Sequence, residues 1–528
     1  LDLAATGFSL AATRTRFEHR AVVLGRDRGE LLAGLASLSA GGESSAVVTG
    51  TAGPLGGVAF MFPGQGSQWA GMGRELYAAF PVFARSIDAC AHALAEWVDW
   101  SLLDVIRGVR GAPTYDRVDV VQPALFSVMV SLAALWRSWG VEPAAVIGHS
   151  QGEIAAAHVC GALSLRDATR VVALRSKALV DLNGHGGMAS VAQSERAVED
   201  YLARSGDRVS VAVVNGPRSV VVSGEPDALD AFVAKMTADG VQARRIKVDY
   251  ASHSHYVTRV RDDVVGPLAG IRPRSGELPF YSTLHGEVID TARLDAGYWY
   301  DNLRQKVRFE TSAGRLAADG FRVFVEMSPH PVLTVPVQDI VEDLDQALVL
   351  SSARRGRGEV EAVLTSLAAL HTAGGPADLG ALFTTRRRVD LPTYAFQRRR
   401  YWLSSAPAPA PTAAAVAAEA VEEPAGADSL VPLSERVGAL APDDARALVL
   451  DHVLERVAVV LGHPSSASID PDGEFMKIGF DSMLSSELSK RLTASTGHKL
   501  RANLVLRHPS PRQVAGHLVS LMTPADTP

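Results

Sequence analysis

The sequence predicts a multidomain protein with a large α/β core, an inserted βαββαβ subdomain and a small all-α domain at its C-terminal end. Three observations support this fold class. A strand–turn–helix pattern surrounds a glycine-flanked serine at position 150. The order of strands and helices changes between about residues 186 and 249. An Ala/Pro-rich stretch then separates the α/β part from a helical C-terminal unit.

Composition places the chain among ordinary globular proteins. At 528 residues it is too long for one hydrophobic core. Hydrophobic residues make up 47 % and charged residues 21 %, and the formal net charge is −6. This balance gives no reason to expect nucleic acid or an anionic membrane as partner. Two cysteines, Cys90 and Cys160, argue against a disulfide framework and for a reducing cytoplasm.

The N-terminal part carries few strong signals. We find no signal peptide and no uninterrupted apolar run of about 18 residues, so no membrane span is expected. The chain begins at Leu1 without methionine, as a piece of a longer polypeptide would. Residues 1–54 are interpreted as an irregular region that ends in the Gly/Ser-rich SAGGESSAVVTGTAGP.

The predicted α/β core begins with the strand Gly57–Phe62. A second buried strand, Ala144–Ser150, leads directly into the helical pattern of Glu153–Gly161, and the strand Phe321–Met327 follows later. Because each strand precedes a helix, we expect a mainly parallel sheet with helices on its faces.

An inserted subdomain is predicted between about residues 186 and 249. The segments read strand MASV, helix SERAVEDYLARS, strand VSVAVV, strand SVVVSG, helix PDALDAFVAKMTADG and strand ARRIKV. This βαββαβ order is that of a ferredoxin-like arrangement.

The C-terminal unit follows a predicted mobile tether. Ser404–Asp428 alternates alanine and proline, which cannot form a packed element. Asp443–Gly462 then shows an amphipathic helical pattern. After the stretch GFDSM, Leu484, Leu488 and Leu492 share one helical face, and a last helix follows Pro511. We predict a four-helix bundle.

The candidate nucleophile is Ser150. Gly148–Gly152 reads GHSQG and fits G-x-S-x-G, in which a serine sits at a sharp strand-to-helix turn. Small flanking residues are needed because the serine backbone is strained. The helix that follows offers the backbone N–H of Gln151 to a developing oxyanion.

The general base is less certain from the residues. The chain has 15 histidines. His149 is next to the nucleophile, but adjacent side chains at such a turn point apart, and His158 fits a core or surface position on the next helix. His253 and His255 lie where the subdomain returns to the core, so both remain candidates, with His253 favoured.

A second glycine-rich turn, Pro63–Gln68, follows the first core strand. It lacks the lysine and spacing of a phosphate-binding loop. Gln65 either donates a second hydrogen bond to the oxyanion or belongs to a purely structural turn, and the residues do not decide between these.

Taken together, several motifs resemble the acyltransferase domains of modular polyketide synthases, relatives of the malonyl-CoA:acyl-carrier-protein transacylases. The resemblance implies an α/β-hydrolase-like core over residues 56–345. The flanking stretches SLAATRTRFEHRAVVL and LPTYAFQRRRYWL are similar to the linker after an upstream ketosynthase and to the segment that closes such domains. The core motifs are FPGQGSQW (Phe62–Trp69), GHSQGE (Gly148–Glu153), LRSKAL (Leu174–Leu179), YASH (Tyr250–His253), NLRQKVRF (Asn302–Phe309) and EMSPHPVL (Glu326–Leu333).

The resemblance assigns a role to each catalytic position. Ser150 would be the acylated nucleophile and His253 its general base. The backbone carbonyl of Asn302 would orient that histidine, and the N–H groups of Gln65 and Gln151 would form the oxyanion hole. No metal is needed for this chemistry.

The resemblance also implies a carboxylated substrate. Arg175 would bind the free carboxylate through its guanidinium fork, and Gln122 would line the same cleft. The forms YASH, GHSQG and RVDVVQ are associated with methylmalonyl selection. Ala251 would leave space for the α-methyl group where malonyl-type enzymes carry Phe, while Tyr250 and Ser252 would shape the pocket. One methyl group is worth only about 1–3 kcal/mol, so moderate selectivity is expected.

GFDSM and the downstream TGHKLRANLVLRHPSPRQVAGHL resemble an acyl carrier protein. Ser482 would carry a covalent 4′-phosphopantetheine, and Asp481 would cap the helix that starts there. Met483 replaces the usual leucine, and RANLVLRHPSP has arginine where an acidic residue is common. These departures concern partner preference and not the attachment chemistry.

The resulting expectation is an acyl transfer in two steps, from methylmalonyl-CoA to Ser150 and then to the carrier thiol. The expected partners are an upstream ketosynthase and a phosphopantetheinyl transferase, in a homodimeric cytoplasmic module. The expected domains are a partial ketosynthase–acyltransferase linker (1–55), the acyltransferase (56–345), a post-acyltransferase linker (346–403), the tether (404–435) and the carrier (436–523).

Three alternatives are weighed against this reading. A hydrolase with the same serine is disfavoured by Arg175 and by the downstream carrier. A retired enzyme that serves only as a scaffold is disfavoured because Ser150, His253, Gln65 and Arg175 are all present. A loading enzyme that takes a starter such as propionyl-CoA is the runner-up, although Arg175 argues against a substrate without a carboxylate.

Overall fold

The computed structural model describes residues 2–42, 44–203, 208–344, 346–393, 433–438, 440–461, 463, 465–478, 480, 482–501 and 504–522. The chain forms two compact units, Thr15–Leu382 and Leu1–Arg14 together with Phe383–Pro528. Most of the predicted tether and most of the stretch LPTYAFQRRRYWL lie outside the described residues.

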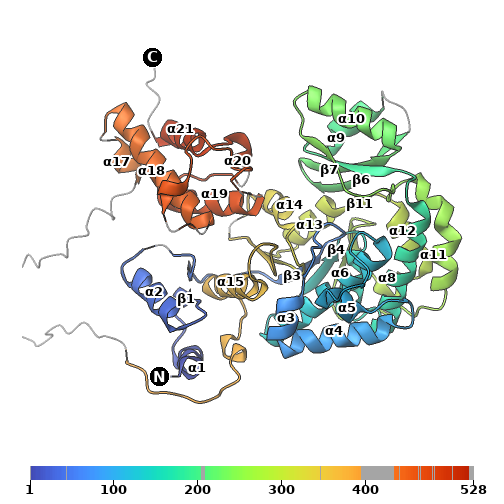
Figure 1. Ribbon diagram of the computed structural model, residues 1–528, viewed down its shortest axis with the longest axis horizontal. Helices are drawn as coiled ribbons and strands as arrows, with labels where there is room; N and C mark the ends of the chain where they lie inside the picture. The colour runs from blue at the N-terminus through green and yellow to red at the C-terminus, as the bar shows by residue number, and fades with distance from the viewer. Residues whose placement is uncertain are drawn as a thin grey trace, which may run out of the picture. The chain divides into compact units, whose positions relative to one another are not determined.

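The larger unit is built on a six-stranded sheet with the order β10-β9-β4-β3-β12-β13 (Figure 1). All neighbouring pairs are parallel except β10–β9. The prediction of a mainly parallel sheet is therefore confirmed. The strands are β3 (Val58–Phe62), β4 (Ala145–Gly148), β9 (Phe280–Ser282), β10 (Glu287–Ile289), β12 (Val323–Glu326) and β13 (Leu348–Ser351).

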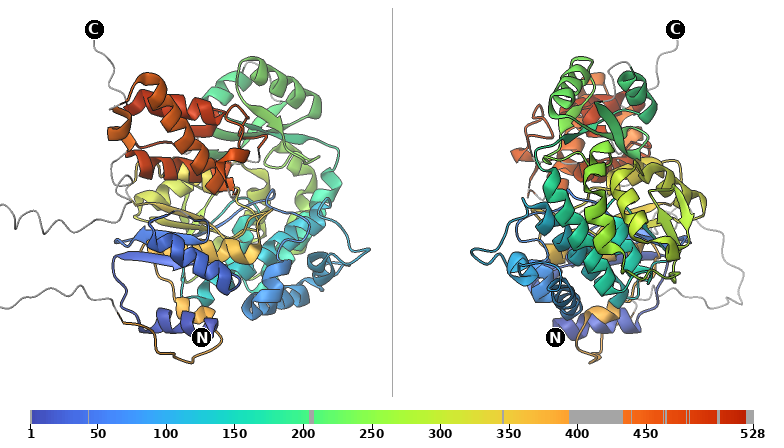
Figure 2. Two further views of the ribbon diagram at one scale, coloured as in Figure 1. Left: turned by 60° about the vertical axis from the view of Figure 1, so that its left-hand side comes forward. Right: turned by 90° about the vertical axis from the view of Figure 1, so that its right-hand side faces the viewer.

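Helices cover both faces of this sheet (Figure 1, Figure 2). Every residue of β3 is buried, as expected for a central parallel strand. Its alternate residues serve two cores: Phe60 and Phe62 pack in one, Ala59 and Met61 in the other. The first core contains α4 (Pro81–Leu94), α6 (Val118–Ser138), α7 (Gly152–Val159) and α8 (Leu165–Leu179), and the second contains α13 (Phe309–Ala318) and α14 (Thr334–Ile340).

Helix α6 is long and apolar enough to cross a membrane, judged by length and composition alone. However, 89 % of its most apolar stretch is buried inside the protein. It packs against α4 and α8, and such burial is typical of the central helix of a globular core.

A second sheet, with the order β11-β6-β7-β5-β8, is inserted between α8 and the return of the chain to the core. Its first elements follow the order β5-α9-β6-β7-α10-β8, and their strand pairs are antiparallel. The fifth strand, β11 (Val307–Arg308), comes from the core and pairs in parallel with β6. The other elements are β5 (Gly187–Val191), α9 (Glu195–Leu202), β6 (Val209–Gly216), β7 (Ser219–Gly224), α10 (Pro226–Ala238) and β8 (Ala243–Arg245).

The irregular region expected over residues 1–54 is wrong. It contains α1 (Leu3–Thr13), β1 (His19–Val23), α2 (Arg28–Ser39) and β2 (Val47–Thr51). Strands β1 and β2 pair with each other and pack on α15 (Glu359–Thr372), more than 300 residues away in the chain. Many of their side chains remain partly exposed, so hydrophobic periodicity gives little signal there. The segment predicted as a linker after residue 345 likewise supplies β13 to the main sheet.

The C-terminal region is helical, as predicted. Its helices are α17 (Leu433–Gly438), α18 (Pro442–Leu461), α19 (Ser482–Thr496), α20 (Leu504–Arg507) and α21 (Pro511–Met522). Their apolar faces form one separate core, which includes Val449, Val453, Val457, Phe475, Leu488, Leu492 and Leu518.

Candidate active site

Ser150 sits on a sharp turn between β4 and α7. Its φ angle of 53° lies in the left-handed region, which costs energy for a residue with a side chain. No larger residue fits at either flanking glycine. A Cβ atom on Gly152 would lie 1.9 Å from the carbonyl oxygen of Phe62, and one on Gly148 would lie 2.2 Å from the backbone nitrogen of Glu153. The G-x-S-x-G spacing is therefore a steric requirement of this turn.

Ser150 faces a histidine from a distant part of the chain. Its Oγ lies 2.9 Å from Nε2 of His253, and Nδ1 of His253 lies 2.9 Å from the carbonyl oxygen of Gln305. A carbonyl can only accept, so Nδ1 carries the proton and Nε2 is free to accept one from Ser150. His255, the other candidate, instead stacks on Tyr256 with ring centroids 4.1 Å apart.

The prediction that the carbonyl of Asn302 orients His253 is wrong. Asn302 lies inside α12 (Ala296–Arg304), where carbonyl groups run along the helix axis. Gln305 is the first extended residue after that helix, and its carbonyl turns toward the histidine. Asn302 instead uses its side chain, whose Nδ2 donates to the Ser150 carbonyl at 3.2 Å.

Two backbone N–H groups flank the nucleophile. Gln65 follows β3, and Gln151 precedes the first residue of α7. Among the described residues, neither of these backbone N–H groups donates to another backbone group. The loop that holds Gln65 approaches the serine closely, since a Cβ atom on Gly64 would lie 3.7 Å from Cβ of Ser150. The Gln65 side chain accepts from the hydroxyl of Tyr250 at 3.0 Å.

Arg175 is a buried cation, and no carboxylate within the described residues forms an ion pair with it. It is 1 % exposed. Nη1 donates to Oε1 of Gln122 at 3.1 Å, and Nη2 donates to Oδ1 of Asn302 at 3.3 Å. Its Nε has no hydrogen-bond partner in the described part of the chain. Burial lowers the pKa of Arg175 to about 10. A guanidinium whose hydrogen-bond partners are neutral, and whose Nε–H has no partner, is suited to bind a carboxylate.

The remaining predicted residues line the start of the inserted sheet. Tyr250, Ala251 and Ser252 are all buried. Ala251 faces Gly186, where an added Cβ atom would lie 2.5 Å from the alanine methyl. The hydroxyl of Ser252 points toward Sδ of Met188 at 3.2 Å. Hydrogen bonds join most of the predicted residues into one network. Ser150 bonds to His253 through its hydroxyl and to Asn302 through its carbonyl. Arg175 donates to Asn302 and Gln122. Gln122 donates to Gln65, which also accepts from Tyr250.

The comparisons with known proteins bear on this geometry. Residues 59–377 match the family model of the acyl transferase domain, and residues 451–518 match that of the phosphopantetheine attachment site. The chain belongs to the polyketide synthase acyltransferases. The C-terminal region of the chain is a carrier region that holds 4′-phosphopantetheine covalently. Both parts were predicted from the sequence motifs.

Several relatives of this acyltransferase are known. Spectinabilin polyketide synthase system protein NorC of Streptomyces orinoci is 48 % identical over 98 % of this chain and 23 % of its own length. Polyketide synthase GfsB of Streptomyces halstedii is 53 % identical over 80 % of this chain and 8 % of its own. The chain thus spans a quarter or less of these curated relatives.

Solved structures with the same fold include other polyketide synthase acyltransferases. The acyltransferase domain from module 8 of the salinomycin polyketide synthase is 51 % identical with a TM-score of 0.68, covering 70 % of this chain and 88 % of that one. A loading acyltransferase from the avermectin modular polyketide synthase is also 51 % identical with a TM-score of 0.58, covering 60 % and 100 %.

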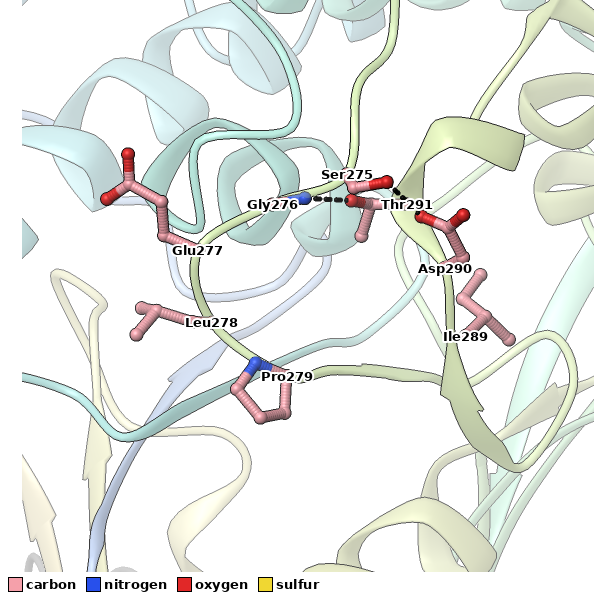
Figure 3. Close-up of a pocket in the computed structure, with 8 residues that line it drawn as sticks. All are labelled: Ser275, Gly276, Glu277, Leu278, Pro279, Ile289, Asp290 and Thr291. Atoms are coloured by element: carbon pink, nitrogen blue, oxygen red, sulfur yellow. Dashed lines mark hydrogen bonds between the residues drawn. The ribbon is translucent and has the colours of Figure 1, made fainter.

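Two surface hollows of the acyltransferase lie away from Ser150. One, of about 270 Å³, is lined by residues 275–279 and 289–291 (Figure 3). Its polar groups satisfy one another, because Ser275 donates to Asp290 and the Gly276 N–H donates to Thr291. The other, of about 290 Å³, lies beside Arg208 and its ion-pair partner Glu225. Neither includes a residue that contacts the nucleophile.

The pH dependence of a reaction that uses His253 as its base should reflect the burial of that imidazole. Burial, aided by the charge of Arg175, lowers the pKa of His253 to about 3 from 6.5. A lowered pKa keeps the imidazole neutral, and therefore basic, at every pH above it. The rate of Ser150 acylation should stay level between about pH 8 and about pH 5. Stopped-flow release of CoA at each pH measures this rate.

A fall in that rate with a midpoint near the unperturbed value of 6.5 would contradict the prediction. Stability has to be followed in parallel. Because the folded state resists protonation of His253, it loses stability as the pH falls below 6.5 toward about 3. Circular dichroism at each pH separates a loss of rate from a loss of fold.

Proposed function

We propose that this acyltransferase loads a methylmalonyl unit from coenzyme A onto Ser150 and passes it to a phosphopantetheine thiol carried by Ser482. The observation that carries the proposal is the hydrogen bond between Ser150 and His253 beside the buried cation Arg175. The first pair supplies a nucleophile with its base. The cation supplies recognition of a free carboxylate.

The reaction follows from the geometry. As Oγ of Ser150 attacks the thioester carbonyl, Nε2 of His253 takes its proton. The C–S bond breaks, and the same proton leaves with the CoA sulfur. The backbone N–H groups of Gln65 and Gln151 stabilise the negative oxygen formed on the way. In the second half, His253 takes a proton from the incoming thiol and returns it to Oγ as the ester is cleaved.

The carrier attachment site is proposed to be Ser482. When bound, 4′-phosphopantetheine supplies the thiol that receives the acyl group. Ser482 is the first residue of α19, directly after the chain segment that contains buried Phe480. Ser485 and Ser489 of the same helix are buried and so are less accessible to a modifying enzyme. The side chain of Ser482, and Asp481 before it, lie outside the described residues.

The choice of methylmalonyl is supported by the small residue at position 251. Ala251 is fully buried against Gly186. A larger side chain there would occupy space near the base, since His253 is two residues away. An α-methyl group contributes about 1–3 kcal/mol of discrimination, so a preference over malonyl and not an exclusion is proposed.

A starter-loading function is the second candidate. One solved relative, from the avermectin polyketide synthase, is a loading acyltransferase and is 51 % identical. Such an enzyme taking propionyl-CoA would leave the Arg175 guanidinium buried without an anion, which is costly. The buried arginine therefore favours an extender unit with a carboxylate.

The proposal also covers the subdomains around the site and the larger enzyme to which the chain would belong. We assign the inserted sheet as a ferredoxin-like subdomain and the core as α/β-hydrolase-like. We place the chain in a cytoplasmic, homodimeric module with an upstream ketosynthase, modified by a phosphopantetheinyl transferase. Residues 56–345 are assigned as the central acyltransferase. The flanking segments 1–55 and 346–403 are proposed to connect to neighbouring domains, although each also contains regular elements, such as β13 of the main sheet.

Replacing Arg175 with alanine tests the substrate. Removing one partner of a buried charge pair costs about 2–5 kcal/mol, so methylmalonyl transfer should fall by roughly 30-fold or more. Propionyl transfer should be kept or improved, because no carboxylate has to be paired. A competition among malonyl-, methylmalonyl- and propionyl-CoA, read by mass spectrometry of the carrier, measures both effects.

The matched control is Arg166→Ala on the same helix. Arg166 pairs at the surface with Glu96, so its loss should leave the competition unchanged. Undiminished methylmalonyl transfer by Arg175→Ala would rule out the carboxylate-binding role. Rapid release of free acid by the unaltered protein, without acylation of the carrier, would instead favour a hydrolase.

A further inference from the structure

Glu153 directly follows the G-x-S-x-G turn and takes no part in the acyl transfer steps. It lies in the first turn of α7 and its exposed fraction is 0 %. A carboxylate is rarely buried so completely without a purpose, because removing it from water is costly. A glutamate directly after G-x-S-x-G, in an otherwise apolar helix, was a signal that the sequence offered.

Three groups donate to this carboxylate, and a fourth is shared with another acceptor. Oε1 accepts from the backbone N–H of Thr283 at 2.5 Å. The hydroxyl of Thr283 lies 2.9 Å from Oε1 and 2.9 Å from the Gly148 carbonyl, and these two acceptors share its one proton. Oε2 accepts from the hydroxyl of Tyr298 at 2.7 Å and from Nδ2 of Asn302 at 2.9 Å. Burial raises the pKa of Glu153, and these hydrogen bonds, that of Tyr298 first, lower it. A backbone N–H and an amide NH₂ can only donate, so the group is held as an acceptor on both oxygens.

Glu153 thereby fixes which way the amide of Asn302 points. Nδ2 of Asn302 has two acceptors, Oε2 of Glu153 at 2.9 Å and the Ser150 carbonyl at 3.2 Å. The amide oxygen must then face the opposite way. It faces Arg175, whose Nη2 donates to it at 3.3 Å.

We infer that Glu153 is a positioning residue for Arg175, acting through the side chain of Asn302, and that it sets the preference for carboxylated acyl-CoA substrates. This inference rests on the proposed role of Arg175 in binding the substrate carboxylate. Glu153 touches neither the substrate nor the reacting atoms. It connects the nucleophile turn and the carboxylate-binding arginine through one amide, so both are held in a common geometry.

The substitution Glu153→Gln tests this inference. It keeps the shape of the side chain but replaces one acceptor oxygen with an NH₂ donor. Its single amide oxygen has to face the Thr283 N–H, because that backbone donor cannot turn. Its NH₂ group then faces Nδ2 of Asn302, so two donors meet. Asn302 relieves this conflict by flipping its amide, at the expense of its hydrogen bond to the Ser150 carbonyl. The flipped Asn302 presents its own NH₂ to Arg175, and the guanidinium loses an acceptor. Arg175 should move away from its position for the carboxylate.

The readout is the ratio of acylation rates with methylmalonyl-CoA and propionyl-CoA, measured as a burst of CoA release from the full chain. In Glu153→Gln this ratio should fall by roughly 10-fold to 100-fold, because a shift of about 1 Å costs rates of that order. A defect in the nucleophile or the fold would lower both rates together and leave the ratio unchanged. Such an unchanged ratio in a folded variant would overturn the inference.

Controls separate this inference from the proposed function. Glu326→Gln removes another fully buried carboxylate, which accepts from Ser328 and three backbone N–H groups, and should leave the ratio unchanged. A ratio that falls there as well would overturn the inference. If Glu153→Gln does not fold, Asn302→Ala removes the same link, and an unchanged ratio in that variant would equally overturn it. If Arg175→Ala leaves the ratio unchanged, the proposal that Arg175 binds the substrate carboxylate is wrong. If Arg175→Ala lowers the ratio and Glu153→Gln does not, only the inference about Glu153 is wrong.

Discussion

Replacing Ser150 with alanine should abolish the acyl-enzyme and slow loading of the carrier by a factor on the order of 10⁴ to 10⁶. The expected loss is large because the two-step route depends on one oxygen atom. Without Oγ, His253 has no hydroxyl to deprotonate, and the carrier thiol has no ester to attack. Intact-mass measurement after incubation with methylmalonyl-CoA should show one added acyl group on the unaltered chain and none on the variant.

The variant has a matched control on helix α6. Ser127 is fully buried, and its hydroxyl donates to the carbonyl of Pro123 within its own helix at 2.8 Å. Ser127→Ala should keep both the acyl-enzyme and carrier loading. An acyl group that persists on Ser150→Ala would place the nucleophile elsewhere. Acyl-enzyme on the unaltered chain would also dispose of the idea that this protein is only a scaffold for its carrier.

The nucleophile was predictable because its signal is local. Strand, turn, helix and both glycines lie within a few residues of Ser150, and the steric conflict that demands glycine arises inside that segment and at the adjacent strand β3. The base was not predictable in this way. His253 lies 103 residues further along the chain from Ser150, and only the return of the chain after the inserted sheet places it beside the serine and His255 away from it.

The features that the sequence did not predict share one physical cause. Each of them depends on where a helix ends or on which distant element a segment packs against. The oriented carbonyl belongs to Gln305 instead of Asn302 because α12 stops at Arg304. Strand β11 was missed because its two residues form a strand only by adding to the edge of β6. The β1–β2 pair depends on packing against α15. None of these partners can be read from the segment itself.

Replacing Ser482 with alanine should remove carrier loading completely while leaving acylation of Ser150 intact. The hydroxyl is the proposed point at which phosphopantetheine is attached, so the variant has no thiol to receive the acyl group. After treatment with a phosphopantetheinyl transferase and methylmalonyl-CoA, intact mass should show one acyl group and no phosphopantetheine. The unaltered chain should show phosphopantetheine and an acyl group at the carrier.

This result would show that Ser150 and Ser482 have different roles, one as the nucleophile and the other as the phosphopantetheine attachment site. Ser485→Ala, three residues along the same helix at a buried position, should keep the phosphopantetheine and the loaded carrier. If phosphopantetheine still appears on Ser482→Ala, the attachment site is another residue of the carrier region. Because the variant has no thiol on its own chain to discharge Ser150, the acyl-enzyme should also persist longer in the variant than in the unaltered chain. Free pantetheine added to the variant should then discharge Ser150, since the catalytic pair of Ser150 and His253 is intact and lacks only an acceptor.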